Sequence, residues 1–481
     1  MCPVWTRSEL RRTFHRTMRI AVVVRAFPTV SETFVLNQVT GLIDRGHDVH
    51  IFAAASGRPA AIHDEIISYR LMDRARHSAW LPAHHPHRLL VALPLMAKAL
   101  FRRRANGARL LSTARFGFRS APLELLSDAA AFQEGDSFDV VLCHHGPMGA
   151  RVARLRDAGV VSGRVVTVFH GSDVSAYVRR VGSHAYAHLF ATGDLFLPVS
   201  DHWRRRLIAL GCPAERIAVH GMGVDCRRFA FARRERRAGE PLRLVTVARL
   251  VERKGVANGI RAVAELARSG IDVEYTIVGD GPLSGVLVHL ARELGVSERV
   301  RLIGSVSHGA VAAILARSHV LVAPSVTASD GDMEGIPVAI MEAMASGLLV
   351  VSTVHSGIPE LIEDDVTGYL VPEGDARALA ARLMHLARDF TPAQRVCTAA
   401  RRLIVQRHDI DKLNDRLVRH FDALMNDCGK PQLTVHPEKA AGGIGAGRTL
   451  GLRGRGQPAV HAESAEDRGE RGDERHTLRA L

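Results

Sequence analysis

The stretch MRIAVVV, residues Met18–Val24, is an almost continuous apolar run with the length of one buried strand. Strands that are apolar on both faces are typical of parallel sheets covered by helices on both sides. Helical periods such as Glu32–Arg45 and Trp203–Leu210 separate this run from similar ones. The other predicted strands of this first series are Val49–Ala53, Val140–Cys143, Val165–Phe169 and Leu195–Val199.

A second series of the same kind begins after the charged connector Cys226–Glu240. Its predicted strands are Leu242–Val247, Val273–Val278, Val300–Leu302, Val320–Val322, Leu348–Ser352 and Tyr369–Val371. Its predicted helices are Val256–Arg268, Leu283–Leu294, His308–Arg317, Pro337–Ala345 and Ala376–Arg388. The two series predict an α/β chain with two doubly wound, Rossmann-like domains facing across a cleft. Ligands of such sheets bind at the carboxyl ends of the strands.

The ends of the chain differ in composition from its middle. We expect an unstructured extension at 1–17, an N-terminal domain at 18–228, a C-terminal domain at 229–408, a helix at 409–428 that packs back toward the N-terminal domain, and a disordered tail at 429–481. Translation could start at Met1 or at Met18. The last 52 residues contain no Phe, Tyr or Trp. They therefore bury too little apolar surface to offset the entropy of ordering.

The overall composition is that of an ordinary folded protein, with 47% hydrophobic and 24% charged residues in 481. Six cysteines are scattered without a CxxC pair, which indicates a reducing compartment and no structural zinc site. No apolar run reaches the roughly 20 residues of a membrane span, and no secretory leader is recognisable. We therefore expect a cytoplasmic protein.

Positive charge is concentrated in one segment. The formal net charge is +14, and residues 74–123 contain ten Lys/Arg and no Asp/Glu. Leu, Val and Phe are interleaved with these arginines, which suits an anionic membrane surface and predicts a peripheral position at the inner face of the cytoplasmic membrane. A solvated helical face is the alternative. Nucleic acid is not expected as a partner, because no DNA- or RNA-binding motif accompanies the charge.

The stretch SDGDMEGIPVAIMEAMASG, residues Ser329–Gly347, holds two glutamates. Pro337 is tolerated only in a first helical turn, so the helix is predicted to start near Ile336, with Glu334 in the preceding loop and Glu342 inside the helix. If all eight residues were helical, the two carboxylates would lie about 12 Å apart along the axis. They could contact two parts of one hydroxyl-rich ligand, with a phosphate at the helix N-terminus between them. Alternatively, Glu342 is a core residue paired with Arg or Lys.

Two cations follow the first strand of the second series, in VARLVERKG, residues Val247–Gly255. Arg249 and Lys254 lie at the predicted cleft, where they could stabilise a diphosphate. A solvated turn is the alternative, and we expect Glu252 and Arg253 to be solvated.

Two other loops are candidates for the same cleft. In VGDGPLSG, residues Val278–Gly285, we interpret Gly279 and Gly281 as a tight turn under a nucleotide and not as an NAD site, because the first strand of each series lacks the glycine fingerprint. FHGSDVSAY, residues Phe169–Tyr177, places His170 and Asp173 at the end of a strand, where either a structural or a functional role is open.

Taken together, these motifs resemble the retaining GT-B glycosyltransferases of family 4. The resemblance extends over roughly Met18 to Asn426 and includes Glu-x7-Glu as Glu334 and Glu342. The stretches VHGMGVD and HSGIPELIEDDVTGYLVPEGD are also similar to this family. AFPTVSETFVLNQV, residues Ala26–Val39, is similar to the narrower subgroup of colanic acid and exopolysaccharide biosynthesis.

The resemblance implies a role for each matching residue. Arg249 and Lys254 would hold the leaving diphosphate, Glu334 the hydroxyls of the donor sugar, and Glu342 the nucleotide ribose. His170, with Glu334, would act at the reacting carbon.

The resemblance also implies a set of loops around the nucleotide. Gly279, Gly281, Gly335 and Ile336 would form the nucleotide and phosphate loops. Ser31, Glu32 and Asp173 would lie near the phosphate or the acceptor, with Ser31 and Glu32 replacing the glycine pair of many relatives. Asp330 and Asp332 lie in the loop before the helix, and neither a bound metal nor another cofactor is expected.

The function implied is transfer of a hexose, with retained configuration, from a nucleotide-diphosphate sugar, with UDP favoured. The acceptor would be a lipid-linked saccharide in exopolysaccharide biosynthesis. The domain at 18–228 would bind the acceptor and that at 229–408 the donor. A sugar-nucleotide epimerase on the same fold and a non-catalytic sugar-nucleotide-binding protein are the alternatives.

Overall fold

The computed structural model describes residues 16–29, 32–57, 64–78, 121–132, 136–237 and 239–426. Ser31, nearly all of the 1–17 extension, most of the basic segment 74–123 and the predicted tail at 429–481 lie outside these residues. Among the described residues, no helix is both long enough and apolar enough to cross a membrane.

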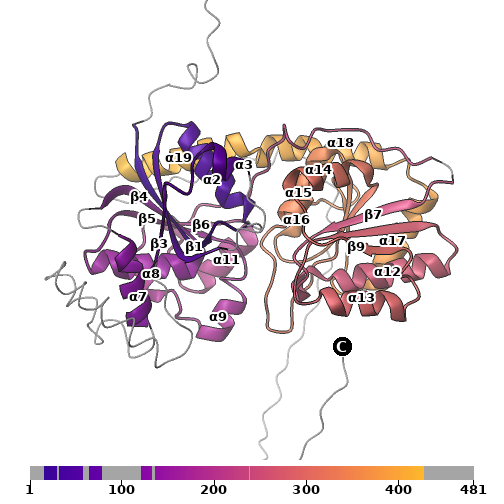
Figure 1. Ribbon diagram of the computed structural model, residues 1–481, viewed down its shortest axis with the longest axis horizontal. Coiled ribbons are helices and arrows are strands. Elements are labelled where there is room, and N and C mark those ends of the chain that lie inside the picture. The colour runs from indigo at the N-terminus through magenta and orange to yellow at the C-terminus, as the bar shows by residue number, and fades with distance from the viewer. Residues whose placement is uncertain are drawn as a thin grey trace, which may run out of the picture. The chain divides into compact units, whose positions relative to one another are not determined.

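The first half of the chain forms a six-stranded parallel sheet with the strand order β3-β2-β1-β4-β5-β6 (Figure 1). Its strands are β1 Arg19–Phe27, β2 Asp48–Ser56, β3 Ala75–His77, β4 Ser137–His144, β5 Ser162–Phe169 and β6 Leu195–Pro198. Its helices are α2 Thr33–Asp44, α3 Asp64–Ser68, α7 Ala121–Ala131, α8 Gly146–Asp157, α9 Ala176–Val181, α10 Ala187–Thr192 and α11 Asp201–Ala209, followed by the 3-10 turn η1 Ala214–Arg216. The edge strand β3 was not predicted, because its three residues are half-exposed and include no apolar run.

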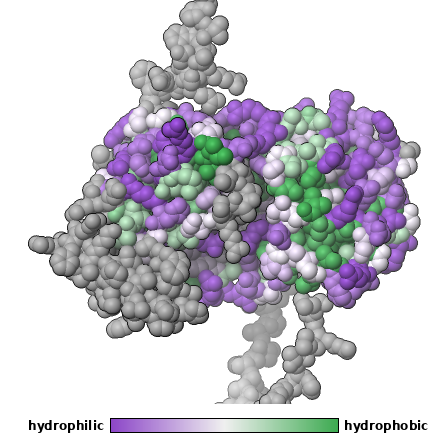
Figure 2. Space-filling view, in the orientation of Figure 1, coloured by the Kyte–Doolittle hydropathy of each residue, from purple (hydrophilic) through white to green (hydrophobic). Residues whose placement is uncertain are grey.

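The second half forms another six-stranded parallel sheet, with the order β12-β11-β10-β7-β8-β9. Its strands are β7 Leu242–Val247, β8 Val273–Val278, β9 Val300–Leu302, β10 Val320–Ala323, β11 Leu349–Thr353 and β12 Tyr369–Val371. Its helices are η2 Glu252–Lys254, α12 Val256–Arg268, α13 Ser284–Glu293, α14 His308–Arg317, α15 Val338–Ser346, α16 Ile358–Leu361 and α17 Ala376–Arg388. Polar side chains cover most of the face in Figure 2, and apolar ones gather over this second half.

Each sheet reverses its winding direction at one place. In the first sheet the chain runs outward on one side from β1 and on the other side from β4, and in the second sheet the same happens at β7 and β10. A crevice opens at the carboxyl ends of the strands beside such a reversal, and ligands bind there. The predicted pair of doubly wound domains is therefore confirmed.

The chain crosses between the halves at two adjacent places. The outward crossing follows Val224, and the return crossing passes through α18 Ala393–Leu403 and the π-helical turn η3 Ile404–His408. The N–H of Val224 donates to the carbonyl of His408 at 2.9 Å, and the guanidinium of Arg401 donates to the carbonyls of Cys226 and Phe229 at 3.0 Å each. The two crossings are thus bonded to each other.

The last described helix, α19 Ile410–Asn426, packs against α2 of the first half. Asn414 donates its amide to the carbonyl of Asn37 at 3.1 Å, and Arg45 pairs with Asp415 at 2.6 Å. Gly41 permits this packing, because a Cβ there would lie 1.9 Å from the Asn414 amide nitrogen. The C-terminal helix therefore ends on the N-terminal half.

Candidate active site

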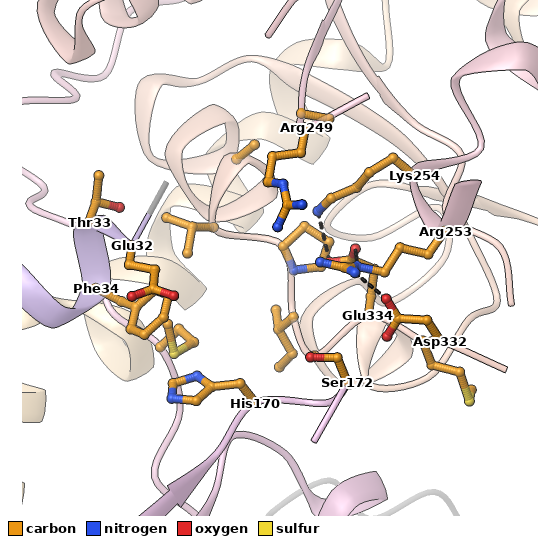
Figure 3. A pocket seen from close by; sticks show the side chains of 18 of the residues that line it. Glu32, Thr33, Phe34, His170, Ser172, Arg249, Arg253, Lys254, Asp332 and Glu334 are labelled. Atoms are coloured by element: carbon orange, nitrogen blue, oxygen red, sulfur yellow. Dashed lines mark hydrogen bonds and ion pairs between the residues drawn. The ribbon is translucent and has the colours of Figure 1, made fainter. Parts of the chain in front are cut away.

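A cavity of about 910 Å³ lies at the carboxyl ends of both sheets and is lined by residues of both halves. Figure 3 shows Glu32, Phe34 and His170 of the first half opposite Arg249 and Glu334 of the second. A cavity of this size is at the upper end of the range for small-molecule sites. The strand reversals of the two sheets thus contribute to one site.

Glu334 is buried and holds two cations. Arg253 Nε donates to its Oε1 at 2.8 Å and Lys254 Nζ to its Oε2 at 2.9 Å. Arg253 also pairs with Asp332. Burial alone would raise the pKa of Glu334, but Lys254 and Arg253 hold it below its ordinary value. The expectation that Arg253 is solvated is therefore wrong, because the 3-10 turn η2 directs it into the cavity wall.

Glu252, which the sequence predicts to be solvated, agrees with that expectation. It stays exposed, but its carboxylate accepts from the backbone N–H of Ser329 at 2.9 Å and from the Ser329 hydroxyl at 2.7 Å. It therefore ties η2 to the loop that precedes α15.

The backbone of Glu334 is fixed by its own contacts. Its N–H donates to His355 Nε2 at 3.1 Å, and its carbonyl accepts from the Ser356 hydroxyl at 2.7 Å. His355 Nδ1 in turn contacts Glu373 Oε2 at 2.8 Å. Because His355 accepts at Nε2, its proton lies on Nδ1. These contacts orient the Glu334 carboxylate before any ligand arrives.

Gly335 brings the two halves into backbone contact. A Cβ on Gly335 would lie 2.1 Å from the carbonyl oxygen of His170. Gly171 has φ of +124°, and a Cβ there would lie 2.7 Å from the Gly335 nitrogen. No side chain larger than hydrogen fits at either position, so this glycine pair sets how closely the loops approach. The next residue, Ile336, is buried and lines the cavity.

Helix α15 begins at Val338, with Pro337 as its N-cap, slightly later than predicted. Glu342 is buried in this helix, and its Oε1 accepts from His308 Nε2 at 2.9 Å. His308 Nδ1 faces Arg228 at 2.8 Å, and Arg228 pairs with Glu65 of the first half at 2.7 Å. The observed partner of Glu342 is thus a histidine, where the sequence pattern allowed an Arg or Lys.

Arg249 and Lys254, the two cations predicted to hold a diphosphate, differ in their contacts. Lys254 is engaged by Glu334, as described above. Arg249 is exposed, and its guanidinium has no hydrogen bond or ion pair with any residue that the structure describes. Figure 3 shows its guanidinium directed into the cavity. Arg249 is therefore a cation ready for an anionic ligand.

The glycines of the loop after β8 are explained by close packing. Gly279 has φ of +128°, and a Cβ there would lie 1.9 Å from the carbonyl oxygen of Ala248. A Cβ on Gly281 would lie 2.5 Å from the Leu250 carbonyl oxygen. Gly279 lines the cavity, whereas Gly281 is not among its described lining residues. Both glycines let this loop pass close under the loop that carries Arg249.

His170 lies between two rings at the first-half side of the cavity. Its ring centroid is 4.6 Å from that of Phe34 and 4.5 Å from that of His145. Its Nε2 is 3.2 Å from Nδ1 of His144. Burial, together with His145 and His144, holds the pKa of His170 well below its ordinary value, so the ring is neutral.

The carboxylate of Asp173 is bound by backbone N–H groups of two loops. Its Oδ1 accepts from the N–H groups of His170 at 3.0 Å and Gly171 at 2.9 Å, and its Oδ2 accepts from the N–H of Gly146 at 2.9 Å. The side chain is buried and joins the loop after β4 to the loop after β5. Asp173 therefore positions His170.

Glu32 forms a charge pair with a histidine that the sequence reasoning missed. His145 Nε2 lies 3.7 Å from Glu32 Oε1, and His145 Nδ1 lies 3.8 Å from Asp173 Oδ2. Burial alone would lower the pKa of His145, but Glu32 and Asp173 raise it. Burial alone would raise the pKa of Glu32, but His145 and Arg25 lower it. The sequence signal was present, since His144 and His145 directly follow a predicted strand.

The described residues contain no group of three or more His, Cys, Asp or Glu side chains arranged to hold a metal ion. Asp332, in the loop before α15, is paired with Arg253.

Comparison with known proteins relates this chain to glycosyltransferases. The model of glycosyltransferase family 4 matches residues 31–228, and the model of glycosyl transferases group 1 matches residues 228–403. WcaL of Salmonella typhimurium, whose name assigns it to colanic acid biosynthesis as a glycosyltransferase, is 42% identical over 405 residues, covering 83% of this chain and 98% of WcaL. AmsK of Erwinia amylovora, an amylovoran biosynthesis glycosyltransferase, is 40% identical over 80% of this chain and 94% of AmsK.

A solved structure has the same fold at low sequence identity. Anabaena HepE, in complex with UDP and glucose, superposes with a TM-score of 0.61 at 18% identity, covering 84% of this chain and 100% of HepE. Two parallel sheets that share one cavity, together with these matches, define a GT-B glycosyltransferase. The chain belongs to glycosyltransferase family 4, together with the colanic acid and amylovoran biosynthesis glycosyltransferases. The predictions of fold, family and glycosyltransferase activity are confirmed.

Proposed function

We propose that the enzyme transfers a hexose, with retained configuration, from a nucleotide-diphosphate sugar to a lipid-linked saccharide in exopolysaccharide biosynthesis. The observation that carries the proposal is the meeting of Arg249, Lys254, Glu334 and Glu342 in one cavity. UDP is the favoured nucleotide. The HepE complex with UDP and glucose, which has the same fold, supports that choice.

The contacts support a division of labour along the cavity. Arg249, which has no anionic partner in the described chain, would take the diphosphate, and Lys254 would bridge the diphosphate and Glu334. Glu334, held by its backbone contacts, would accept from hydroxyls of the donor sugar. His308 occupies one oxygen of Glu342 and leaves Oε2 for the ribose hydroxyls.

In the proposed reaction the bond between the anomeric carbon and the diphosphate oxygen breaks, and the diphosphate leaves with the electron pair. The acceptor hydroxyl oxygen bonds to the anomeric carbon on the same face, and its proton passes to the departing diphosphate. Arg249 and Lys254 neutralise the charge that develops on the leaving group. The proposal assigns this task to side-chain cations and requires no bound metal.

The test is a donor screen with lipid-linked acceptors extracted from membranes, read by mass spectrometry. We expect one nucleotide sugar to add one hexose mass to an acceptor, and Glu334→Ala or Lys254→Ala to abolish the product. Exposed Glu298→Ala is the matched control and should keep full activity. Conversion of a UDP-sugar to its epimer without an acceptor product would overturn the proposal. Unchanged polysaccharide output in cells carrying Glu334→Ala and Lys254→Ala would also overturn it.

We further propose that residues 74–123 hold the enzyme at the anionic inner face of the cytoplasmic membrane, where a lipid-linked acceptor would lie. Their ten cations without an acidic residue support this. Replacing Arg102, Arg103 and Arg104 by Gln should release the protein from anionic liposomes in a flotation assay. Unchanged flotation would contradict membrane attachment. It would not bear on the proposed transfer reaction.

A further inference from the structure

Two neutral histidines, His144 and His170, form one hydrogen bond beside the cavity, and only one of them can supply its hydrogen. His144 ends β4, and His170 follows β5, the neighbouring strand. His144 Nδ1 and His170 Nε2 lie 3.2 Å apart. Burial, with a contribution from His145, lowers the pKa of His144 to about 3, and the pKa of His170 is lowered for the same reasons. Both rings are therefore uncharged near neutral pH, and only one of the two facing nitrogens carries hydrogen.

Two tautomer pairs satisfy this contact, and they give His170 opposite roles. In the first, His144 Nδ1–H donates to His170 Nε2, and His170 carries its own proton on Nδ1. In the second, His170 Nε2–H donates to His144 Nδ1, and His170 Nδ1 is a bare acceptor. The first pair makes His170 a hydrogen-bond donor at its other nitrogen, and the second makes it a base.

The remaining nitrogen of His144 discriminates between the pairs. His144 is fully buried, and its Nε2 has no hydrogen-bond partner in the described part of the chain. The first tautomer pair leaves a lone pair at this buried atom, whereas the second leaves an N–H. Buried N–H groups without a partner are rarer in proteins than under-satisfied acceptors. The burial of His144 Nε2 therefore favours the first pair.

The free nitrogen of His170 is the one that meets a ligand. His170 lines the cavity, and its Nδ1 has no partner among the described residues. Nδ1 of His170 is also accessible to solvent, because the fully buried side-chain atoms without a partner in the described chain do not include it. Phe34 and His145 flank the ring and restrict its rotation. The atom presented to the cavity is thus Nδ1.

We propose that His144 is a positioning residue, which donates its Nδ1–H to His170 and so fixes His170 as an Nδ1–H donor to an oxygen of the donor sugar. His170 then holds the sugar and does not remove the acceptor proton. The identity of the ligand oxygen rests on the proposed function, whereas the tautomer does not.

The first test reads the tautomer directly. Long-range ¹H–¹⁵N spectra of the full chain, labelled with ¹⁵N-histidine and assigned with His170→Asn, should show His170 protonated at Nδ1 and bare at Nε2. His144→Leu removes the donated hydrogen, and His170 should shift toward the Nε2–H form that a free histidine side chain prefers. His144→Asn offers an amide N–H near the position of Nδ1 and should retain the wild-type form. Protonation at Nε2 in the wild-type enzyme overturns the proposal, whether or not transfer is observed.

The second test separates positioning from folding. His144→Leu should lower kcat for transfer about 10- to 100-fold, which is the usual cost of losing a residue that orients another, and less than the roughly 100- to 1000-fold cost of losing a direct transition-state donor. The affinity for UDP alone should not change, because the proposed contact is to the sugar. His144→Asn should restore most of kcat. Equal losses in His144→Leu and His144→Asn, with His170 unchanged in the spectra, would reduce His144 to a packing residue and overturn the proposal.

Discussion

The ammonium of Lys254 donates to the carboxylate of Glu334 at 2.9 Å, and both side chains belong to the wall of the same cavity. Arg253 binds the other oxygen of that carboxylate. In the ligand-free enzyme, Glu334 therefore engages two cations that a diphosphate could otherwise attract, and Asp332 supplies the second negative charge of the cluster.

Glu334→Gln should destabilise the ligand-free enzyme. Removing the anion from a buried charge cluster costs about 3 kcal/mol, since Lys254 loses its anionic partner and Arg253 keeps only Asp332. UDP should recover part of this loss, because its diphosphate brings negative charge to the same cations. Urea unfolding with and without UDP measures both effects. Glu298→Gln, at an exposed position, should change neither. A Glu334→Gln variant as stable as the wild type would show that the cluster contributes little.

The charged form of His145 stabilises the folded enzyme, and this stabilisation is lost at high pH. Its pKa is raised in the folded state, so its contribution is complete below the ordinary histidine value of about 6.5 and is lost as the pH rises through the raised value. His145→Gln should therefore cost more stability at pH 6 than at pH 9. Gln retains a Cβ, so the strain of the positive φ at this position, +72°, is the same at both pH values.

The His145 comparison uses urea unfolding of both proteins at the two pH values. In a Glu32→Gln background the pH dependence of the His145→Gln effect should shrink. An effect of equal size at pH 6 and pH 9 in the native background would contradict a charged His145.

Arg228 should influence nucleotide binding through His308. Arg228 donates to His308 Nδ1, which leaves the Nε2–H of His308 for Glu342. Arg228→Leu should raise KM for the nucleotide sugar about tenfold, the size of a 1.4 kcal/mol loss, with a smaller change in kcat. Glu65→Gln keeps the contact between Arg228 and His308 and should have the smaller effect. The measurement is steady-state kinetics with varied concentration of the nucleotide sugar. Equal changes of KM in the two variants would contradict an effect of Arg228 that acts through His308.

Gly335→Ala tests the backbone contact between the halves. The new Cβ would meet the His170 carbonyl oxygen at 2.1 Å, so the loops must separate, at a cost of about 1–3 kcal/mol. Transfer should fall at least tenfold, because Glu334 and His170 move apart. Gly285→Ala is the control, since nothing lies within 4 Å of its Cβ; it should gain about 0.5–1 kcal/mol in helix α13. Thermal unfolding and transfer rates of both variants provide the measurement.

The two parallel sheets were accessible from the sequence because most of their strands are apolar runs separated by helical periods. Leu242–Val247 and Val273–Val278 coincide with β7 and β8. The predicted run Leu348–Ser352 lies one residue before β11, all of whose residues are buried, as in a strand covered on both sides. The edge strand β3 escaped because an edge strand need not be apolar. The start of α15 shifted because Pro337 caps the helix and does not enter it.

The site was only partly accessible from the sequence. Arg249, Lys254, Glu334 and Glu342 could be singled out, since each follows a strand or flanks a helix start in a recognisable pattern. The partners of these residues could not, because contacts such as Arg253 with Glu334 and His308 with Glu342 join segments far apart in the chain. Whether a buried acid is paired by a cation, a histidine or a ligand depends on that long-range geometry, which no local pattern encodes.

The two bonded crossings between the halves have a mechanical consequence. Because Val224 and His408 are joined by a backbone hydrogen bond, and Arg401 links the return crossing to Cys226, we expect the two halves to rotate about these crossings. Such a rotation would open the contact between Gly171 and Gly335, which joins loops on the two sides of the cavity, and would so admit a substrate.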